Sequence, residues 1–316
     1  MKIVVLDGKA MNPGDLSWEK IKQLGDLNVF DLTKKDEILQ RAEDAEILLT
    51  NKTVLDKEVL SKLKKCKYIG VMASGYNVVD VDYAKSIGII VTNVPNYSTP
   101  TVAQHVFALL LEAYVHVGKH NQAIKNNAWA TSNDFCFYEA PFLELYQKTI
   151  GVVGFGNIGK AVAKIANAFE MNVLIYDKGK IGDDALGKKV ALDTLLKESD
   201  VVSLHIPLKE QTKHIISKEQ IALMKPSSIL INTARAQLVD KGAVISALDE
   251  NQITMYCSDV FDPEPPMMDD PLIMHPKSIF TGHMAWASFE ARTRCLNIVE
   301  KNIEAYLNNQ VINQVN

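Results

Sequence analysis

Short apolar runs alternate with segments of helical period over the first ninety or so residues. Runs typical of buried strands occupy residues 3–6, 29–30, 47–50, 68–72 and 89–92, and helical patterns lie between them at 16–24, 38–42, 57–63 and 80–86. Strands that alternate with helices predict a parallel sheet covered by helices on both faces. Because no glycine-rich turn follows the first strand, we expect this part of the chain not to hold a dinucleotide.

A second series of the same kind begins near residue 150. Strands are expected at 150–153, 172–176, 200–204, 227–232, 253–258 and 278–281, with helices at 218–224 and 240–248. A long helix is expected at 101–119, and the polar loop 96–99 before it is a candidate hinge. We expect the final helical segment, 288–307, to return to the first domain.

The strand at 150–153 runs into three glycines at fixed spacing. Gly154, Gly156 and Gly159 are followed by helical period from Asn157 onward. A strand, a glycine turn and a helix in this order make the fingerprint of a dinucleotide-binding site. Gly154 permits the tight turn, Gly156 lets the backbone approach a pyrophosphate, and Gly159 lets the helix pack on its strand. The competing interpretation is a purely structural turn.

An acidic residue at the end of the next strand strengthens this interpretation. Asp177 lies eighteen residues after Gly159, where a carboxylate accepts hydrogen bonds from the adenosine ribose. A carboxylate at this position repels a 2′-phosphate, so we expect NAD rather than NADP. Lys178 and Lys180 stand close by in the sequence and would soften that preference. The predicted fold class is therefore α/β, with two doubly wound, Rossmann-like parallel-sheet domains and a cleft between them.

Chain length and composition narrow the classes of protein. At 316 residues, two domains are expected: a discontinuous substrate-binding domain at 1–99 plus 287–316, and a NAD-binding domain at 100–286. A net charge of −4 without a lysine or arginine run argues against nucleic acid as a partner. The N-terminal apolar run is too short for a signal peptide and no stretch resembles a membrane span. Four scattered cysteines fit reduced thiols, so we expect a cytoplasmic protein.

One set of residues has the spacing of metal ligands. If the helix at 101–119 continues to His120, it places Glu112, His116 and His120 at i, i+4 and i+8. No fourth ligand is evident, and histidines on an exposed or subunit-facing stripe are common. We therefore expect no metal.

Three chemically active side chains follow the ends of predicted strands. Arg235, Glu264 and His283 come from separate strand ends, and ligands bind at that edge of a parallel sheet. Reduction of a 2-oxo acid needs such a set: a guanidinium for the carboxylate and ketone oxygens, and an acid for the developing oxyanion. A histidine fits the second task, and a carboxylate on its other ring nitrogen orients it and favours its charged form.

Taken together, these motifs resemble the D-isomer-specific 2-hydroxyacid dehydrogenase family. The matching segments are GFGNIG at 154–159, SLHIPL at 203–208, NTAR at 232–235, DVFDPEP at 259–265 and GHMAW at 282–286, with looser matches at ASGYNVVD (73–80) and TVAQH (101–105). The resemblance implies an NAD-dependent oxidoreductase, usually a homodimer that associates through its NAD-binding domain, with the long helix at 101–119 as the contact.

The resemblance also implies a role for individual residues. Arg235 binds substrate, His283 is the acid/base, Glu264 orients it, and Ser74 and Gly75 offer backbone N–H groups to the substrate carboxylate. The cofactor-binding positions implied are Gly154, Phe155, Gly156, Asn157, Ile158, Gly159, Asp177, His205, Ile206, Pro207, Thr212, Thr233, Ala234, Arg235, Asp259, His283 and Ala285. Among these, residues 155–158 would hold the pyrophosphate, residues 205–207 would line the adenosine side, and Asp259 would hold the nicotinamide amide.

The chain departs from the family pattern at three positions. Ala236 stands where glycine usually follows the arginine, Gly282 where proline usually precedes the histidine, and Gln104 where glutamate is usual. None of these changes removes a catalytic group. They bear on loop geometry and on the fit of the substrate.

Two segments resemble one branch of the family, the glycerate dehydrogenases or hydroxypyruvate reductases. These are NPGDLSW at 12–18 and NDFCFYEAPFLEL at 133–145. We therefore expect hydroxypyruvate and glycerate as substrates. The sequence runs to Asn316, and we expect no regulatory domain of the kind that phosphoglycerate dehydrogenases often carry. Glu264 differs from the glutamine of formate dehydrogenases. The alternatives are the same chemistry on D-lactate, 2-oxoisocaproate or glyoxylate, or a non-catalytic NADH-sensing protein like the corepressors that share this fold.

Overall fold

Five parallel strands form the first sheet of the computed structural model, which describes residues 1–139, 142–179 and 186–316. They are β1 (Lys2–Val5), β2 (Asp26–Val29), β3 (Ile47–Thr50), β4 (Tyr68–Val71) and β5 (Ile90–Thr92). The order is β2-β1-β3-β4-β5, and Val4, Leu48, Ile69 and Val91 lie in one row across it. These strands are apolar at nearly every position except in β2 because both faces of the sheet are covered.

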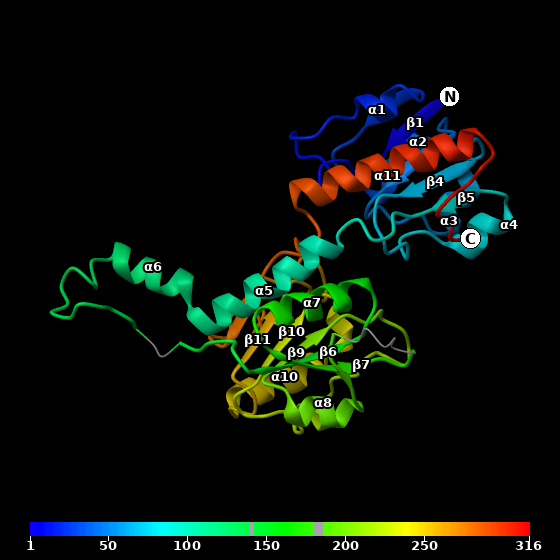
Figure 1. Cartoon of the computed structure of the whole chain (residues 1–316). Coiled ribbons are helices and arrows are strands. Elements are labelled where there is room, and N and C mark those ends of the chain that lie inside the picture. The colour runs from blue at the N-terminus through cyan, green and yellow to red at the C-terminus, as the bar shows by residue number, and fades with distance from the viewer. Residues whose placement is uncertain (140–141, 180–185) are drawn as a thin grey trace. The chain divides into compact units, whose positions relative to one another are not determined.

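Helices pack on both faces of this sheet, as the sequence predicts for a doubly wound domain. One face carries α2 (Ile38–Ala42), α3 (Lys57–Lys62) and α4 (Val81–Ser86). The other face carries α1 (Glu19–Lys22) and α11 (Phe289–Leu307), whose inward residues Cys295, Val299 and Ile303 are almost completely buried. The final helix therefore returns to the first sheet, as expected (Figure 1).

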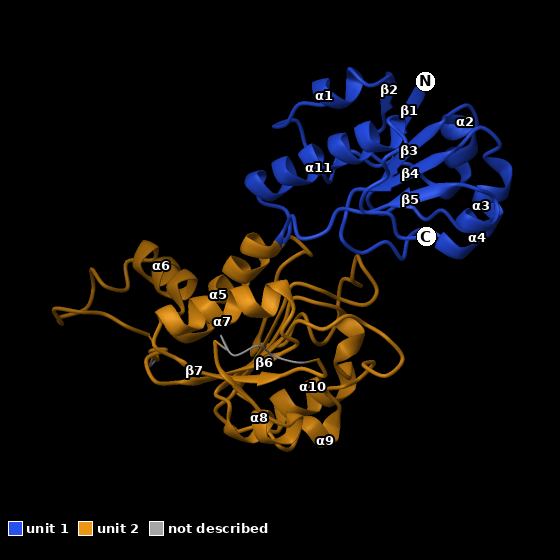
Figure 2. Ribbon diagram, turned by 45° about the vertical axis from the view of Figure 1, so that its right-hand side comes forward, with its two compact units in different colours: residues 1–98, 286–316 blue, residues 99–285 orange. Residues whose placement is uncertain are grey.

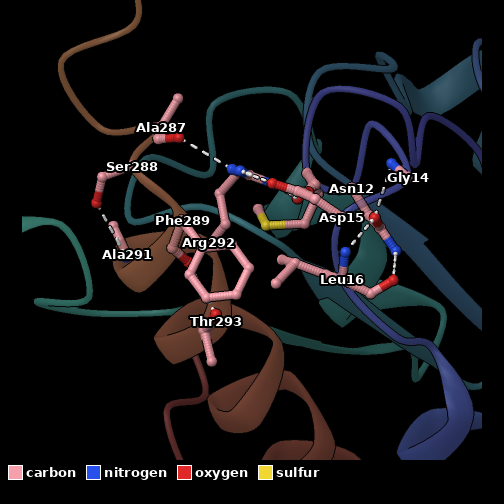
Figure 3. A network of polar contacts seen from close by, with 11 residues as sticks. Asn12, Gly14, Asp15, Leu16, Ala287, Ser288, Phe289, Ala291, Arg292 and Thr293 are labelled. Atoms are coloured by element: carbon pink, nitrogen blue, oxygen red, sulfur yellow. Dashed lines mark hydrogen bonds and ion pairs between the residues drawn. The ribbon is translucent and has the colours of Figure 1, made fainter.

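The loop 12–16 is tied to the beginning of α11 (Figure 3). Asn12 closes the loop, since its Oδ1 accepts the N–H groups of Gly14 and Leu16 at 3.0 and 2.9 Å. Asp15 then forms two parallel bonds of 2.6 Å with the guanidinium of Arg292. The same guanidinium donates from Nε to the carbonyl of Ala287 at 2.9 Å. The segment NPGDLSW, which the sequence offers only as a resemblance, thus fixes the start of a helix.

The second sheet has seven parallel strands among the described residues. They are β6 (Thr149–Val153), β7 (Asn172–Tyr176), β8 (Lys188–Lys189), β9 (Val201–Leu204), β10 (Ile229–Asn232), β11 (Met255–Ser258) and β12 (Ser278–Phe280). Their order is β12-β11-β10-β9-β6-β7-β8, so the chain starts in the middle, winds outward through β7 and β8, and then crosses to β9 on the other side. This is the order of a dinucleotide-binding sheet, in which the crevice at the first strand receives the ligand.

Both faces of the second sheet are covered as well. On one side lie α5 (Thr99–Val115) and α7 (Asn157–Ala168), and on the other α8 (Leu192–Glu198), α9 (Lys218–Ile221) and α10 (Lys241–Asp249). The α/β class with two doubly wound parallel sheets is confirmed. The cleft expected between the domains stays a prediction.

The helix expected at 101–119 is wrong in its extent. Helix α5 begins at Thr99 and ends at Val115, because His116 adopts the left-handed conformation with φ 55°. A second helix, α6 (Val117–Lys125), follows in a new direction (Figure 1). The i, i+4, i+8 alignment of Glu112, His116 and His120 on one continuous helix is therefore also wrong. Among the described residues, no cluster of His, Cys, Asp and Glu is arranged to hold a metal ion.

The chain divides into two compact units, Met1–Ser98 with Trp286–Asn316, and Thr99–Ala285 (Figure 2). They are called unit 1 and unit 2 below. Within the part of the chain that the structure describes, no helix is long and apolar enough to cross a membrane.

Candidate active site

The turn after β6 accepts only glycine at two of its three glycine positions. Gly154 has φ +98°, and a Cβ there would lie 2.7 Å from the carbonyl oxygen of His205. A Cβ on Gly159 would lie 2.0 Å from the carbonyl oxygen of Gly154, so α7 packs against the turn with no room for a methyl group. These two glycines build the turn, as the fingerprint predicts.

Gly156 differs from its neighbours because the space around it is open. A Cβ at this position would meet no atom within 4 Å. Gly156 is also the N-cap residue of α7, so the N-terminus of a twelve-residue helix, where the helix dipole is positive, lies next to that space. Open space beside a helix N-terminus suits a pyrophosphate, and the residues present fit the dinucleotide that the fingerprint implies.

Asp177 is held against this turn. Its Oδ2 accepts the N–H of Phe155 at 2.7 Å, and its Oδ1 accepts the N–H of Gly179 at 2.7 Å. Each carboxylate oxygen can accept a further hydrogen bond, which a ribose hydroxyl would supply. Lys180, expected to modulate this site, lies outside the described residues.

The segment after β9 forms the next wall of this edge. Burial lowers the pKa of His205 to about 3, so its ring is neutral, and Nε2 lies 2.9 Å from the hydroxyl of Ser203. Thr212 closes the following loop, because its hydroxyl donates to the carbonyl of Pro207 at 2.8 Å and accepts the N–H of Lys209 at 2.7 Å. The neutral ring of His205 and the hydroxyls of Ser203 and Thr212 fit the adenosine side of a dinucleotide.

Arg235 is presented by a turn that Asn232 holds at the end of β10. The buried amide of Asn232 donates to the carbonyl of Arg235 at 2.9 Å and accepts the N–H of Ala234 at 3.0 Å. Among the described residues, the guanidinium of Arg235 pairs with no carboxylate, and its hydrogen bond is from Nη1 to the carbonyl of Ala234. The buried hydroxyl of Thr233 likewise has no partner there. A guanidinium without a carboxylate partner and a buried hydroxyl without a hydrogen-bond partner, both on one turn, indicate a place for a ligand.

His283 and Glu264 form a close pair at the ends of β12 and β11. Nδ1 of His283 lies 2.7 Å from Oε2 of Glu264, and the other oxygen of Glu264 accepts the N–H of Phe261 at 2.9 Å. An ionised carboxylate only accepts hydrogen bonds, so Nδ1 carries the hydrogen. Nε2 is then the ring nitrogen left to exchange a proton, in a side chain that is 27% exposed.

Asp259, at the end of β11, is almost completely buried and holds the loop that carries His283. Its Oδ1 accepts the hydroxyl of Thr281 at 2.6 Å and the N–H of Met284 at 2.9 Å, and its Oδ2 accepts the N–H of Ala285 at 2.8 Å. The hydroxyl of Thr281 also lies 2.8 Å from Nε2 of His105 on α5. The sequence interpretation did not single out His105 or Thr281. One signal in the sequence could have pointed to them: His105 is the last residue of the matched motif TVAQH, and Thr281 directly precedes the matched motif GHMAW.

Ser74 and Gly75 follow β4 at the carboxyl edge of the sheet in unit 1. The hydroxyl of Ser74 donates to the carbonyl of Val94 at 2.8 Å, and the amide of Asn93 donates to the carbonyl of Ser74 at 2.7 Å. Within the described residues, neither Ser74 nor Gly75 donates its backbone N–H to a protein acceptor. The two N–H groups are therefore available to an anion.

Comparisons with known proteins identify the family of this chain. Residues 107–285, more than half of the chain, match the family described as D-isomer specific 2-hydroxyacid dehydrogenase, NAD binding domain. A hydroxypyruvate reductase of Blautia hydrogenotrophica is 42% identical over 321 aligned positions that cover 100% of both chains. A glycerate dehydrogenase of Methylorubrum extorquens is 38% identical over 277 positions, 86% of each chain. Among solved structures, an acyclic imino acid reductase in complex with NADPH and D-Arg superimposes with a TM-score of 0.87 at 34% identity, covering 100% of both chains.

Proposed function

The chain belongs to the D-isomer-specific 2-hydroxyacid dehydrogenase family, and we propose that it is an NADH-dependent reductase of hydroxypyruvate that yields D-glycerate. Two relatives of high coverage, one named a hydroxypyruvate reductase and one a glycerate dehydrogenase, support this choice of substrate. The observation that carries the chemistry is the His283–Glu264 pair, since it fixes a proton donor at the carboxyl edge of the second sheet.

Arg235 binds the substrate in this proposal. Its planar guanidinium has free N–H groups that match the carboxylate and the neighbouring ketone oxygen of a 2-oxo acid. The backbone N–H groups of Ser74 and Gly75 donate to no acceptor among the described residues and could bind an anion, which supports unit 1 as the substrate-binding domain. The glycine turn after β6 supports unit 2 as the NAD-binding domain.

His283 delivers the proton. When bound, a reduced nicotinamide supplies the hydride that attacks the ketone carbon. As negative charge develops on the ketone oxygen, Nε2–H of the protonated His283 donates to it, and Glu264 stabilises the positive ring through Nδ1. In the reverse direction, the neutral ring accepts the hydroxyl proton of the 2-hydroxy acid at the same nitrogen.

We propose that NAD(H) rather than NADP(H) is the cofactor. The carboxylate of Asp177 is held at the glycine turn by the N–H of Phe155, where its charge repels a 2′-phosphate. The similar structure that contains NADPH makes this worth testing directly. We expect the ratio of kcat/KM for NADH over NADPH to exceed one in the wild-type protein and to fall about tenfold or more in Asp177→Ala, the equivalent of about 1.4 kcal/mol.

We also propose a homodimer formed through unit 2. The inner residues of α5 pack on α7 within unit 2, so exposed apolar surface lies further along the chain, on α6 and the segment that follows. This surface carries the exposed side chains of Val117, Ile124, Trp129, Phe135, Tyr138 and Phe142. Exposed apolar and aromatic side chains gathered in one segment are typical of an interface, and among them the rings of Tyr138 and Phe142 are in contact. The family resemblance favours a second copy of this chain as the partner. Sedimentation of the wild-type protein as a dimer, with Phe135→Asp shifted toward monomer, is expected; a wild-type monomer would contradict the proposal.

The function is tested by following NADH oxidation with hydroxypyruvate, glyoxylate, pyruvate and 2-oxoisocaproate. We expect the highest kcat/KM for hydroxypyruvate and a loss of turnover of about 10²–10⁴-fold in His283→Ala, with NADH still bound. Turnover confined to another 2-oxo acid would support the proposed reduction of 2-oxo acids and reject hydroxypyruvate as the substrate. Tight NADH binding without turnover of any 2-oxo acid would favour an NADH-sensing protein instead. Four free cysteines, of which Cys136 alone is exposed, support a cytoplasmic site of action.

A further inference from the structure

A chain of hydrogen bonds runs from α5 to the loop that carries His283. Its members are His105, Thr281 and Asp259, all in unit 2. His105 and Thr281 are 176 residues apart in the sequence, so the fold alone brings them together. None of the three is assigned a part in proton transfer by the motifs.

The direction of each hydrogen bond follows from the atoms available. The Thr281 hydroxyl has one hydrogen, and it donates that hydrogen to the Asp259 carboxylate at 2.6 Å. Toward His105 the hydroxyl therefore accepts, so Nε2 of His105 carries a hydrogen and donates at 2.8 Å. The same nitrogen lies 3.6 Å from Oδ1 of Asp259. In each of these contacts, a donor therefore faces an acceptor.

The loop itself depends on this chain for its shape. Asp259 binds the loop on both sides of His283, through Thr281 before it and through Met284 and Ala285 after it. His283 has φ +52°, which a residue with a side chain rarely adopts unless its surroundings impose it. Gly282 adds no restraint, since no atom lies within 4 Å of the place where its Cβ would be.

His105 stands on a rigid support. Its neighbours on α5, Ala103, Val106 and Leu110, are almost completely buried against α7 and the second sheet. From this packed helix, His105 donates a hydrogen bond to the Thr281 hydroxyl, and Thr281 donates to the Asp259 carboxylate. The same carboxylate accepts the backbone N–H groups of the loop after His283. The strained backbone of His283 is thereby held in the orientation that brings Nδ1 to Glu264.

We propose that His105 is a positioning residue for the catalytic His283, acting through Thr281 and Asp259. The proposal rests on the proposed function only in taking His283 as the proton donor. His105 itself contacts neither the reacting atoms nor the two groups of the Glu264–His283 hydrogen bond. Its loss leaves the proton donor present but misplaced, and a displacement of about 1 Å in such a group costs up to about 10²-fold in rate.

Two pairs of variants separate the hydrogen bond from the bulk of the side chain. His105→Ala removes the donor, and His105→Gln keeps an N–H at a similar reach. Thr281→Val removes the hydroxyl at nearly constant volume, and Thr281→Ser keeps it. We expect kcat to fall about 10- to 100-fold in His105→Ala and Thr281→Val, with the dissociation constant for NADH within about twofold of wild type, and to be largely restored in His105→Gln and Thr281→Ser. The matched control is His275→Gln, which removes an imidazole that lies 3.3 Å from Asp249 in the same unit, and its kcat should be unchanged.

The double variant His105→Ala with Thr281→Val tests whether the two residues act together. A loss close to that of either single variant supports one chain of hydrogen bonds, and a loss equal to the product of both overturns it. The low-field proton resonance of the His283 Nδ1–H bond, measured without substrate, gives a readout that does not depend on turnover. Its loss or displacement in His105→Ala, but not in His275→Gln, supports the proposal. An unchanged resonance together with an unchanged kcat in His105→Ala overturns the proposal. If the wild-type protein reduces no 2-oxo acid, the proposed function is rejected, and the resonance still tests whether His105 positions His283.

Discussion

The carboxylate of Glu264 and the imidazole of His283 lie 2.7 Å apart, at Oε2 and Nδ1, although they follow different strands. The second oxygen of Glu264 accepts the N–H of Phe261 at 2.9 Å, and this hydrogen bond restrains rotation of the carboxylate away from the ring. This arrangement fixes which ring nitrogen exchanges a proton. It also places the negative charge of the carboxylate directly beside the imidazole ring.

Replacing Glu264 by Gln should weaken this donor. The amide can still accept the Nδ1 hydrogen, but it carries no charge to stabilise the protonated ring. We expect kcat for 2-oxo acid reduction to fall about 10- to 100-fold, and the pH at which half of that activity is lost to move downward. The measurement is the pH dependence of kcat for both proteins at saturating NADH.

Glu264→Asp serves as the matched control, because it keeps the charge and shortens the side chain. It should lower kcat through distance, with a smaller displacement of the pH profile than Glu264→Gln. Identical pH profiles for wild type and Glu264→Gln would show that the pair does not govern proton donation.

Two glycine-to-alanine substitutions in the turn after β6 should have different effects, one on the stability of the fold and the other on the binding of NADH. Gly159→Ala places a methyl carbon 2.0 Å from the carbonyl oxygen of Gly154, far inside van der Waals contact, so we expect loss of thermal stability. Gly156→Ala meets no protein atom within 4 Å and has an ordinary backbone φ of −71°, so its Tm should stay close to that of wild type. Its methyl group would enter the space for the pyrophosphate, and we expect the dissociation constant for NADH to rise about tenfold or more.

Calorimetry and NADH titration on both variants check this prediction. The contrary result is an NADH affinity for Gly156→Ala equal to that of wild type, which would place the pyrophosphate elsewhere.

Much of this architecture could be predicted from the sequence because buried parallel strands have a recognisable pattern, a short run of apolar residues. The runs at 47–50 and 150–153 fall within one residue of β3 and β6. The edge strand β8 (Lys188–Lys189) was missed, since two exposed lysines have no apolar pattern. The break between α5 and α6 was missed too, because the apolar period continues through His116 while its backbone turns into the left-handed region.

The candidate site divides in the same way. Arg235, Glu264 and His283 could be named in advance because each follows a strand end, and the family they indicated is confirmed by the match over residues 107–285. Their individual roles stay predictions. His105 could not be connected with His283 from sequence, because that connection depends on how α5 packs across the sheet and on a hydroxyl with a single hydrogen.

The four cysteines should differ sharply in reactivity. Cys136 is exposed, whereas Cys66, Cys257 and Cys295 are buried. Burial raises the pKa of the Cys66 and Cys257 thiols to about 12, and it raises that of Cys295 as well, so these thiols are protonated and out of reach near neutral pH. A thiol-specific reagent should modify one cysteine of four in the folded protein and all four in denaturant, as counted by mass spectrometry. Cys136→Ser should abolish the fast labelling, and labelling of a second cysteine in the folded protein at a similar rate would contradict the packing described.

Asp15 and Arg292 form an ion pair (Figure 3). This pair should make the stability of the folded protein depend on pH in a definite direction. The hydrogen bonds from the Arg292 guanidinium hold the pKa of Asp15 below its usual value. A carboxylate with a lowered pKa stabilises the folded state fully above its unfolded value of about 3.9, and that stabilisation is lost as the pH falls through the lower folded value.

Replacing Asp15 by Asn should therefore lower Tm by a few degrees near pH 7, because the buried guanidinium of Arg292 loses its counter-charge. The difference in Tm between the two proteins should shrink as the pH is lowered from about 7 to about 3, since wild type loses the same charge on protonation. Thr293→Val, on the adjacent exposed turn of α11, serves as the control and should show a pH dependence parallel to that of wild type. A constant difference in Tm across this range would mean that Asp15 acts through the shape of the loop, which Asn12 closes, and not through its charge.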